Sequence, residues 1–236
     1  MSNKKIKNPL WDNELNIEKR LDFLINSLTL DEKISCMSNA NPDIDRLGIR
    51  AFNIGGEGAH GVQARHDQGW DLREPDFTTI FPNPIGMSRS WDEDMLKKSG
   101  EVVGIETRGL FAAGKSGSLS VWAPTVDMER DPRWGRNEEA YGEDPYLTSV
   151  MGTAMIKGFQ GSLLNSPTSM AACAKHFVAY GASEGGKDYN STFVPERVLR
   201  NVYLPPFKAA VDAGCATFMT SFNDNDGVPG TANKFV

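Results

Sequence analysis

From residue 47 onward, short apolar runs alternate with longer amphipathic stretches, a pattern typical of repeated βα units. The short runs are the expected strands, and they lie at 51–54, 81–87, 119–128, 170–178 and 216–222. The stretches with helical periodicity between them lie at 91–111, 144–159 and 195–213. A strand followed by a helix in successive repeats predicts a parallel sheet, which either stays open or closes into a barrel.

The last two expected helices have recognisable boundaries. Asp144 stands directly before Pro145, and a capping side chain followed by proline is a typical helix start. The helix after it ends at Gly214, which suits the left-handed residue beyond a helix terminus. The same helix contains Pro205-Pro206, which should kink it or split it in two.

The first part of the chain has a different pattern. Apolar residues recur at helical spacing over 16–28, and a second short helix is expected from a cap at Thr29 or Asp31 to Met37. We therefore predict a helical segment at 1–46 and an α/β domain at 47–236. A complete eight-stranded barrel takes about 250 residues. With about five βα units, the prediction is a (β/α)8 TIM-barrel-like domain that is incomplete.

Composition excludes several classes of partner. Lysine and arginine number 25 against 31 acidic residues, a net charge of −6, so no basic surface for nucleic acid is expected. No run reaches the ~18 apolar residues of a membrane span, and the polar start lacks the apolar stretch of a signal peptide, which favours a cytoplasmic protein. The 3 cysteines are far apart, which argues against a disulfide framework or a metal site. No cofactor is expected.

A glycine-rich turn follows the first expected strand. Gly56, Gly58 and Gly61 form a G-x-G-x-x-G pattern, and Asp76 stands in the place of the acidic residue of a dinucleotide site. No helical periodicity follows, although the pyrophosphate of a dinucleotide needs a helix N-terminus there. A structural turn, a weaker dinucleotide-binding oxidoreductase hypothesis and a ligand site centred on Glu57 remain open.

Two further clusters follow expected strands, at the end of a parallel sheet where ligands bind. In 123–136, acidic residues and arginines are interleaved with Trp134 and prolines, which indicates a buried ion network or ligand contact by at least one arginine. Lys175-His176 closes the fourth strand. Successive side chains of a strand point to opposite faces, so both can serve one pocket only where the backbone is irregular.

Together these motifs resemble the N-terminal barrel domain of glycoside hydrolase family 3, the family of bacterial β-glucosidases and β-xylosidases. The most specific matches are Glu-Arg-Asp-Pro-Arg-Trp-Gly-Arg at 129–136 and Glu-Glu-Ala-Tyr-Gly-Glu-Asp-Pro-Tyr at 138–146. Other similar segments are 60–62, 175–177, 184–190, 219–223 and 226–229. The resemblance covers nearly the whole chain from about residue 16.

The resemblance implies a sugar pocket in the first subsite. Glu57 takes the place of the family's carboxylate that grips the hydroxyls farthest from the anomeric carbon, and the ring's remaining hydroxyls are matched by Arg136, Lys175 and His176. His176 is expected to donate a hydrogen bond without carrying charge. The resemblance also assigns substrate contacts to Arg65, Lys187, Met219 and Phe222.

The family has a retaining mechanism, with an aspartate nucleophile on a later strand and an acid/base carboxylate from a following domain. By this resemblance both residues lie beyond Val236. The sequence departs from the family at Phe222, where many members have tyrosine, and at Gln63, where many have arginine and Arg65 is the candidate replacement.

The resemblance therefore implies hydrolysis of terminal, non-reducing β-D-glucosyl or β-D-xylosyl residues, with a β-glycoside or oligosaccharide as substrate. The 236-residue chain supplies sugar-binding residues without the catalytic pair and is expected to be inactive alone. The alternative is a non-catalytic carbohydrate-binding or partner-complemented fragment.

Three structural expectations follow. The side chains of Glu57, Arg136, Lys175 and His176 should meet in one cavity, and the backbone at 175–177 should be irregular, since the resemblance implies non-proline cis peptides near it. The chain should also associate with a complementary C-terminal polypeptide, associate with itself through 216–222, or be only marginally folded.

Overall fold

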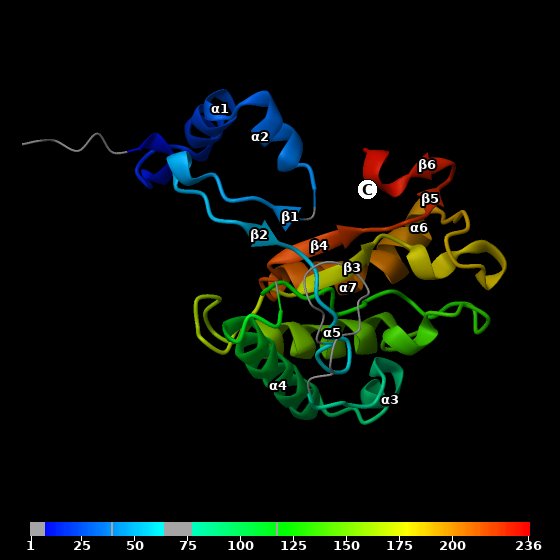
Figure 1. The fold of residues 1–236 in the computed structure, drawn as a ribbon. Helices are drawn as coiled ribbons and strands as arrows, with labels where there is room; N and C mark the ends of the chain where they lie inside the picture. The colour runs from blue at the N-terminus through cyan, green and yellow to red at the C-terminus, as the bar shows by residue number, and fades with distance from the viewer. Residues whose placement is uncertain (1–7, 39, 64–76, 117) are drawn as a thin grey trace, which may run out of the picture. The chain divides into compact units, whose positions relative to one another are not determined.

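The computed structural model describes residues 8–38, 40–63, 77–116 and 118–236. It contains two compact units, Met1–Ile54 and Gly55–Val236, and each is described by itself (Figure 1). The sequence placed a boundary between residues 46 and 47. The boundary found lies later because residues near 52 pair with residues near 40 and so belong to the first unit.

The N-terminal unit contains the two expected helices, α1 (Ile17–Ser27) and α2 (Leu30–Ser35). Thr29 caps α2 in a capping box with Glu32, because each side chain bonds the other residue's backbone N–H. The expected strand 51–54 is β2 (Phe52–Asn53), which pairs antiparallel with β1 (Ala40–Asn41) instead of starting a parallel sheet. Leu10, Ile44 and Leu47 form the small core of this unit.

The second unit contains the expected parallel pair. β3 (Cys173–Phe177) lies beside β4 (Thr217–Thr220), within the runs predicted at 170–178 and 216–222. A short antiparallel pair follows, β5 (Asp224–Asn225) with β6 (Val228–Pro229).

The run 119–128 is extended beside β3 without forming a named strand. Val121 and Val126 donate backbone hydrogen bonds to Ala171 and Lys175, and the two segments form isolated parallel bridges there. Pro124, which follows a cis peptide bond, has no N–H to give to a ladder.

The strand predicted at 81–87 is wrong. Residues Pro84–Ser88 form helix α3, with Pro84 in its first turn. Proline is pre-organised for that position and cannot donate to a sheet, so the apolar run is helical instead.

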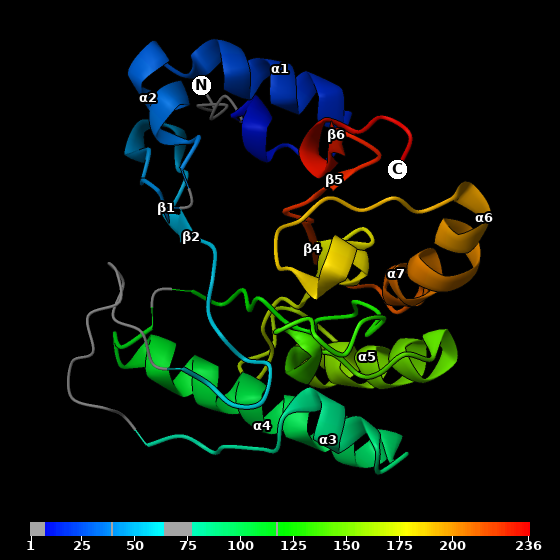
Figure 2. The same ribbon diagram turned by 90° about the vertical axis from the view of Figure 1, so that its right-hand side faces the viewer.

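The helices α4 (Glu93–Ala112) and α5 (Pro145–Gln160, capped by Asp144) lie within one or two residues of the bounds predicted for them. The helix predicted at 195–213 corresponds to three successive segments, the last of which is α7 (Leu204–Asp212). At the prolines the helix changes type and does not break. α6 (Glu196–Val198) and a π-helical segment (Leu199–Tyr203) precede α7, and Tyr203 and Leu204 keep right-handed helical φ and ψ. Figure 2 shows α5 between α4 and α7, and it packs on both.

Small residues allow α4 and α5 to approach closely. A Cβ placed on Gly158 of α5 would lie 2.3 Å from the carbonyl oxygen of Lys97 and 2.9 Å from the Cα of Gly100 in α4. The core around this crossing includes fully buried Leu96 and Phe159.

A single side chain joins the end of α5 to both strands of the parallel pair. Gln160 donates through Nε2 to the carbonyl oxygen of Gly214 at 2.9 Å. Its Oε1 accepts from the backbone nitrogens of Ala172 at 3.3 Å and Ala216 at 2.8 Å. The starts of β3 and β4 are thereby fixed to the end of α5.

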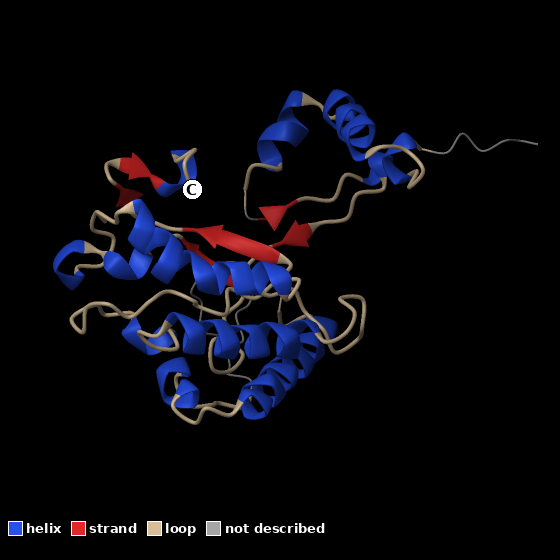
Figure 3. Cartoon of the chain, turned by 180° about the vertical axis from the view of Figure 1, so that it is seen from behind, coloured by secondary structure: helices blue, strands red, loops and turns tan. Residues whose placement is uncertain are grey.

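A parallel pair with helices packed against it is an α/β arrangement (Figure 3). In the part of the chain that the structure describes, the sheets are each two-stranded, and barrel closure is not among their pairings. The incomplete TIM-barrel prediction therefore stays a prediction.

Candidate functional site

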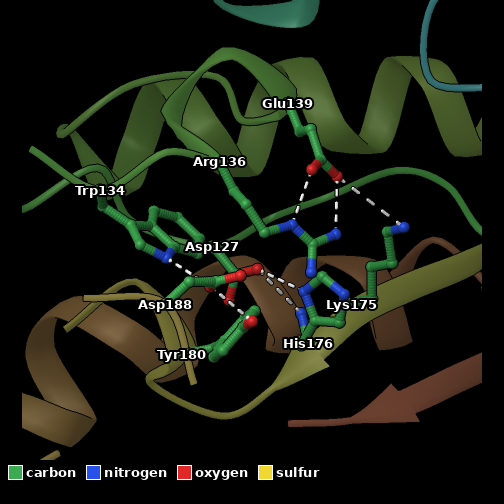
Figure 4. Close-up of polar contacts among 8 residues, drawn as sticks. All are labelled: Asp127, Trp134, Arg136, Glu139, Lys175, His176, Tyr180 and Asp188. Carbon is green, nitrogen blue, oxygen red and sulfur yellow. Dashed lines mark hydrogen bonds and ion pairs between the residues drawn. The ribbon is translucent and has the colours of Figure 1, made fainter. Parts of the chain in front are cut away.

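Polar side chains from the segment 127–139, from β3 and from the loop after β3 meet in the second unit (Figure 4). The 8 residues drawn are Asp127, Trp134, Arg136, Glu139, Lys175, His176, Tyr180 and Asp188. The segment 123–126 lies alongside β3 through backbone hydrogen bonds, which carries the residues that follow it to the end of that strand.

Glu139 joins two of the cations. Arg136 donates to it through two nitrogens, with Nε–Oε1 of 2.6 Å and Nη2–Oε2 of 2.8 Å. Lys175 Nζ lies 4.0 Å from Glu139 Oε2. The single 3₁₀ turn Asn137–Glu139 brings Glu139 back over Arg136, which makes this fork-to-fork pair possible.

Burial and charge act against each other in this cluster. Burial lowers the pKa of Lys175, and the nearby Glu57 and Glu139 carboxylates oppose that change. Burial alone would raise the pKa of Glu139, but the bonds from Arg136 and the charges of Lys175 and His176 outweigh it, and the pKa is lowered. The cluster therefore holds charged donors and acceptors away from most solvent.

Glu57 lies in the glycine-rich turn, half-buried and close enough to act on the charge of Lys175. The turn packs tightly on the segment that leads to the site. A Cβ on Gly55, which has a φ of 109°, would lie 2.3 Å from the Trp122 ring, and one on Gly58 would lie 2.4 Å from Val121 Cγ2. The glycines thus have a structural role in placing Glu57.

The backbone at the end of β3 is irregular, as predicted. The Lys175-His176 and Phe177-Val178 peptide bonds are cis, and the pairing with β4 shifts register between Ala174 and Phe177. Lys175 and His176 are neighbours in the chain, yet both are buried, at 5% and 1% exposed, and Figure 4 shows both beside Arg136.

His176 is held by Asp127. Its ring Nδ1 lies 2.7 Å from Asp127 Oδ2, which also accepts from the His176 backbone nitrogen at 3.2 Å. A carboxylate only accepts, so Nδ1 carries the hydrogen. A neutral His176 then presents Nε2 as an acceptor, and it donates there only as imidazolium. The expectation that an uncharged His176 donates to a ligand is therefore wrong for Nε2.

Aromatic rings lie beside the polar cluster, next to Arg136 and Asp188. Asp188 Oδ1 accepts from Trp134 Nε1 at 2.9 Å and from the Tyr180 hydroxyl at 2.6 Å. The Arg136 guanidinium carbon lies 5.4 Å from the Tyr180 ring centre and 5.9 Å from that of Phe222. The rings can attract the guanidinium through their electron-rich faces.

The remaining predicted residues lie in different environments. Phe222 reaches the cluster, with its ring 5.1 Å from that of His176, and is 50% exposed. Met219 is half-buried in β4, whereas Lys187 is exposed in the loop after β3. Arg65 lies outside the described residues, as does Asp76 of the dinucleotide hypothesis.

Sequence reasoning did not single out Glu139 and Asp127. The spacing of Glu139, three residues after Arg136, could have indicated a turn that folds back on it. Asp127 gave no local signal, because its partner His176 is 49 positions away.

The rest of the segment 129–136 forms separate ion contacts. Arg133 pairs with Asp131 through two bonds, and its side chain is 70% exposed. Glu129 is half-buried, and its Oε1 atom has no hydrogen-bond partner among the described residues. Burial raises the pKa of Glu129 to about 7, helped by Glu143 and opposed by Arg89. The segment thus combines an ion network with one arginine directed to the candidate site.

Metal clusters and membrane-spanning helices are both absent from the described ranges. No three His, Cys, Asp or Glu side chains there lie close enough to hold a metal ion. No helix in those ranges has the length and apolar character to cross a membrane.

The arrangement suits a neutral ligand with many hydroxyls. Such a ligand needs strong acceptors and strong donors together, and Glu57, Arg136 and Lys175 supply both within one neighbourhood. Comparison with known proteins agrees with this chemistry. The family description "Glycosyl hydrolase family 3 N terminal domain" matches residues 62–236. The chain belongs to glycosyl hydrolase family 3.

Curated relatives of this family 3 chain are glycosidases. A periplasmic beta-glucosidase of Salmonella typhimurium is 42% identical over 158 residues, which are 67% of this chain and 20% of that protein. A probable exo-1,4-beta-xylosidase of Aspergillus terreus is 33% identical over 98% of this chain and 31% of that protein. The chain thus spans less than a third of the length of these two relatives.

Solved structures show the same fold. A family 3 exo-beta-xylosidase in complex with a xylobiose aziridine probe has a TM-score of 0.81 and 31% identity, covering 97% of this chain and 30% of that one. A beta-glucosidase from Listeria innocua in complex with glucose has a TM-score of 0.73 and 30% identity, covering 94% and 35%. Family membership favours a glycosidase over the dinucleotide hypothesis.

Proposed function

We propose that this chain is the sugar-binding part of a glycosidase that hydrolyses terminal, non-reducing β-D-glucosyl or β-D-xylosyl residues with retention of configuration. The observation that carries the proposal is the buried cluster in which Glu139 holds Arg136 and Lys175 together beside the His176–Asp127 pair. The substrate is a β-glycoside or an oligosaccharide.

In this proposal the first sugar ring lies among Glu57, Arg136, Lys175 and His176. Glu57 accepts from hydroxyls, and Lys175, whose 4.0 Å ion pair is longer than a hydrogen bond, gives N–H groups to others. Arg136 is oriented by Glu139. Donors that tighten on the ring as it flattens toward an oxocarbenium ion would favour the transition state.

Further substrate contacts are proposed for Arg65, Lys187, Met219 and Phe222. Retention needs two carboxylates about 5–5.5 Å apart, one acting as nucleophile and one as acid and then base. We propose that this pair is not among the 236 residues.

Sugar binding by the 236-residue chain tests the proposal. Titration calorimetry with methyl β-D-glucoside and methyl β-D-xyloside should give binding of at least one ligand, which Lys175→Met should abolish. Lys208→Met is the matched control, because Lys208 is exposed on α7. Absence of binding in the unmodified chain, or equal binding in both variants, would contradict the proposal. A chromogenic β-glycoside should not be hydrolysed by the chain alone.

The alternative is a carbohydrate-binding or partner-complemented protein without catalysis. Within the described residues β4 pairs with β3 alone, and Phe218 on it is 40% exposed. An open strand edge with an apolar side chain favours pairing with a complementary C-terminal polypeptide or with a second copy. Sedimentation of the purified chain distinguishes these cases, and a stable monomer with a cooperative melt would contradict association.

A cytoplasmic location belongs to the same proposal. The Salmonella typhimurium relative is named as a periplasmic enzyme, so location is to be measured directly. Fractionation of cells that express the native gene should place the protein in the cytoplasm, and recovery outside it would refute this point.

A further inference from the structure

One edge of the Arg136 guanidinium is committed to Glu139. Its Nε and Nη2 atoms donate to the two carboxylate oxygens at 2.6 and 2.8 Å. A guanidinium carries five N–H groups in a rigid plane, so a second edge, formed by Nη1 and the other hydrogen of Nη2, points away from Glu139. A ligand can meet Arg136 at this second edge, and the direction of the edge depends on what holds the plane of the group.

The ring of Tyr180 lies against this guanidinium. The Arg136 guanidinium carbon is 5.4 Å from the Tyr180 ring centre, and the Tyr180 side chain is fully buried. The ring also packs edge-on against Trp134, at 5.3 Å between centres, and against His176, at 4.9 Å. Tyr180 therefore cannot turn away from Arg136 without displacing both of these neighbours.

The hydroxyl of Tyr180 has a fixed direction (Figure 4). It donates to Asp188 Oδ1 at 2.6 Å, and the same oxygen accepts from Trp134 Nε1 at 2.9 Å. Burial raises the pKa of Tyr180, and the Asp188 carboxylate adds to this, so the hydroxyl keeps its hydrogen. Because that hydrogen is given to Asp188, the phenolic oxygen can only accept from its other neighbours.

The phenolic oxygen of Tyr180 supports the charge of Arg136. Burial alone would lower the pKa of Arg136, but the Glu139 carboxylate and the Tyr180 oxygen outweigh it, and the pKa is raised. Glu139 thus holds one edge of the guanidinium, and Tyr180 restrains its plane. Two restraints at different points define the direction of the second edge.

Close packing joins the loop after β3 to the segment that carries Arg136. A Cβ placed on Gly181 would lie 2.2 Å from the carbonyl oxygen of Met128. A Cβ on Gly186, which has a φ of 66°, would lie 2.9 Å from the Cβ of Arg133. The loop therefore rests directly on that segment, which keeps the tyrosine ring and the guanidinium together.

We propose that Tyr180 and Asp188 are positioning residues that direct the second edge of Arg136 toward the sugar. This inference rests on the proposed function, because it takes the first sugar ring to bind at Arg136. Asp188 sets the direction of the Tyr180 hydroxyl, and Tyr180 restrains the guanidinium that the ring hydroxyls meet. In this role neither residue has to touch the sugar, so their loss acts on binding through Arg136.

The test removes the Tyr180 hydroxyl and keeps the ring. In Tyr180→Phe, the Arg136 Nε–H signal, assigned by its loss in Arg136→Lys, should exchange with water faster in NMR spectra of the 236-residue chain. Calorimetry with methyl β-D-glucoside and methyl β-D-xyloside should show binding weakened by about threefold to tenfold, the size of a lost hydrogen bond. Tyr203→Phe is the matched control, because Tyr203 is a buried tyrosine that interacts with Arg130 instead. It should leave both readouts unchanged.

Two substitutions test Asp188. Asp188→Ala removes the acceptor of the Tyr180 hydroxyl and should weaken sugar binding as Tyr180→Phe does. Asp188→Asn keeps an oxygen acceptor and should restore most of the affinity. Equal weakening by Asp188→Ala and Asp188→Asn would overturn the role of Asp188.

Two other results would overturn the proposal as a whole. One is weakening by Tyr203→Phe as large as that by Tyr180→Phe, which would indicate a general loss of packing. The other is an Arg136 Nε–H signal that Tyr180→Phe leaves unchanged. If the unmodified chain binds neither sugar, the proposed function fails, and the Arg136 signal still decides whether Tyr180 positions the guanidinium.

Discussion

Replacing Glu129 with glutamine should remove the part of the pH dependence of the unfolding free energy that comes from the Glu129 carboxyl. Burial raises the pKa of this carboxyl from 4.5 to about 7 in the folded chain. The folded state thus holds the proton more tightly than the unfolded state, so the stabilisation is complete below pH 4.5 and is lost as the pH rises through about 7. A pKa difference of about 2.5, at about 1.36 kcal/mol for each unit, corresponds to roughly 3.4 kcal/mol. Because Glu129 is only half-buried, solvent screening reduces this to about 1–2 kcal/mol.

Urea unfolding followed by tryptophan fluorescence measures the effect. The free energy of unfolding of Glu129→Gln minus that of the unmodified chain should increase by about 1–2 kcal/mol between pH 5 and pH 8. Other titrating groups cancel in this difference. Glu101→Gln is the control, since Glu101 is exposed on α4. A difference that stays constant across this pH range would refute the reasoning.

Four further substitutions have clear expectations. Gly158→Ala should destabilise the chain by about 2 kcal/mol or more, because the added methyl group meets the α4 backbone. Gly109→Ala, in α4 with nothing within 4 Å, should stabilise it by about 0.5–1 kcal/mol, and thermal melts compare the two. Asp188→Ala should cost about 2 kcal/mol in urea unfolding because two buried donors lose their acceptor. Thr29→Ala should weaken α2 by about 1 kcal/mol, seen as faster amide exchange in that helix.

Helices could be predicted well from the sequence because their signals are local. Asp144 and Thr29 cap helices through neighbouring backbone groups, and the prolines after residue 204 end the π-helical segment within the same stretch. Strands were harder to predict. The run 81–87 is apolar and short, but Pro84 begins a helix there, and Pro124 interrupts the ladder that 119–128 would otherwise form.

The sequence could predict which residues form the candidate site. It could not predict which of these residues bond to one another. The motif that contains Arg136 and the pair Lys175-His176 can be recognised in the sequence. The irregular backbone is expected because the side chains of Lys175 and His176, which are adjacent in a strand, must face the same pocket. Which nitrogen of His176 carries hydrogen depends on Asp127, a long-range partner. Glu139 becomes the centre of the cluster only when the 3₁₀ turn closes over Arg136.

The hydrogen bonds of Gln160 hold the starts of β3 and β4, so the loop after α5 can differ in length more freely than Gln160 itself can be replaced. At their starts, β3 and β4 are both bonded to one amide side chain at the end of α5, and Thr217 also donates directly to the Ala172 carbonyl oxygen. Residues 161–163, directly after α5, are exposed, whereas the carbonyl oxygens of Leu164 and Ser169 accept hydrogen bonds from Arg108 of α4. Insertions at 161–163 should leave Lys175 and His176 in place, whereas a single exchange of Gln160 for glutamate would remove the donor to Gly214 and put a charge beside both strands. For protein engineering, we expect residues 161–163 to accept a tag or a second domain without displacement of the site.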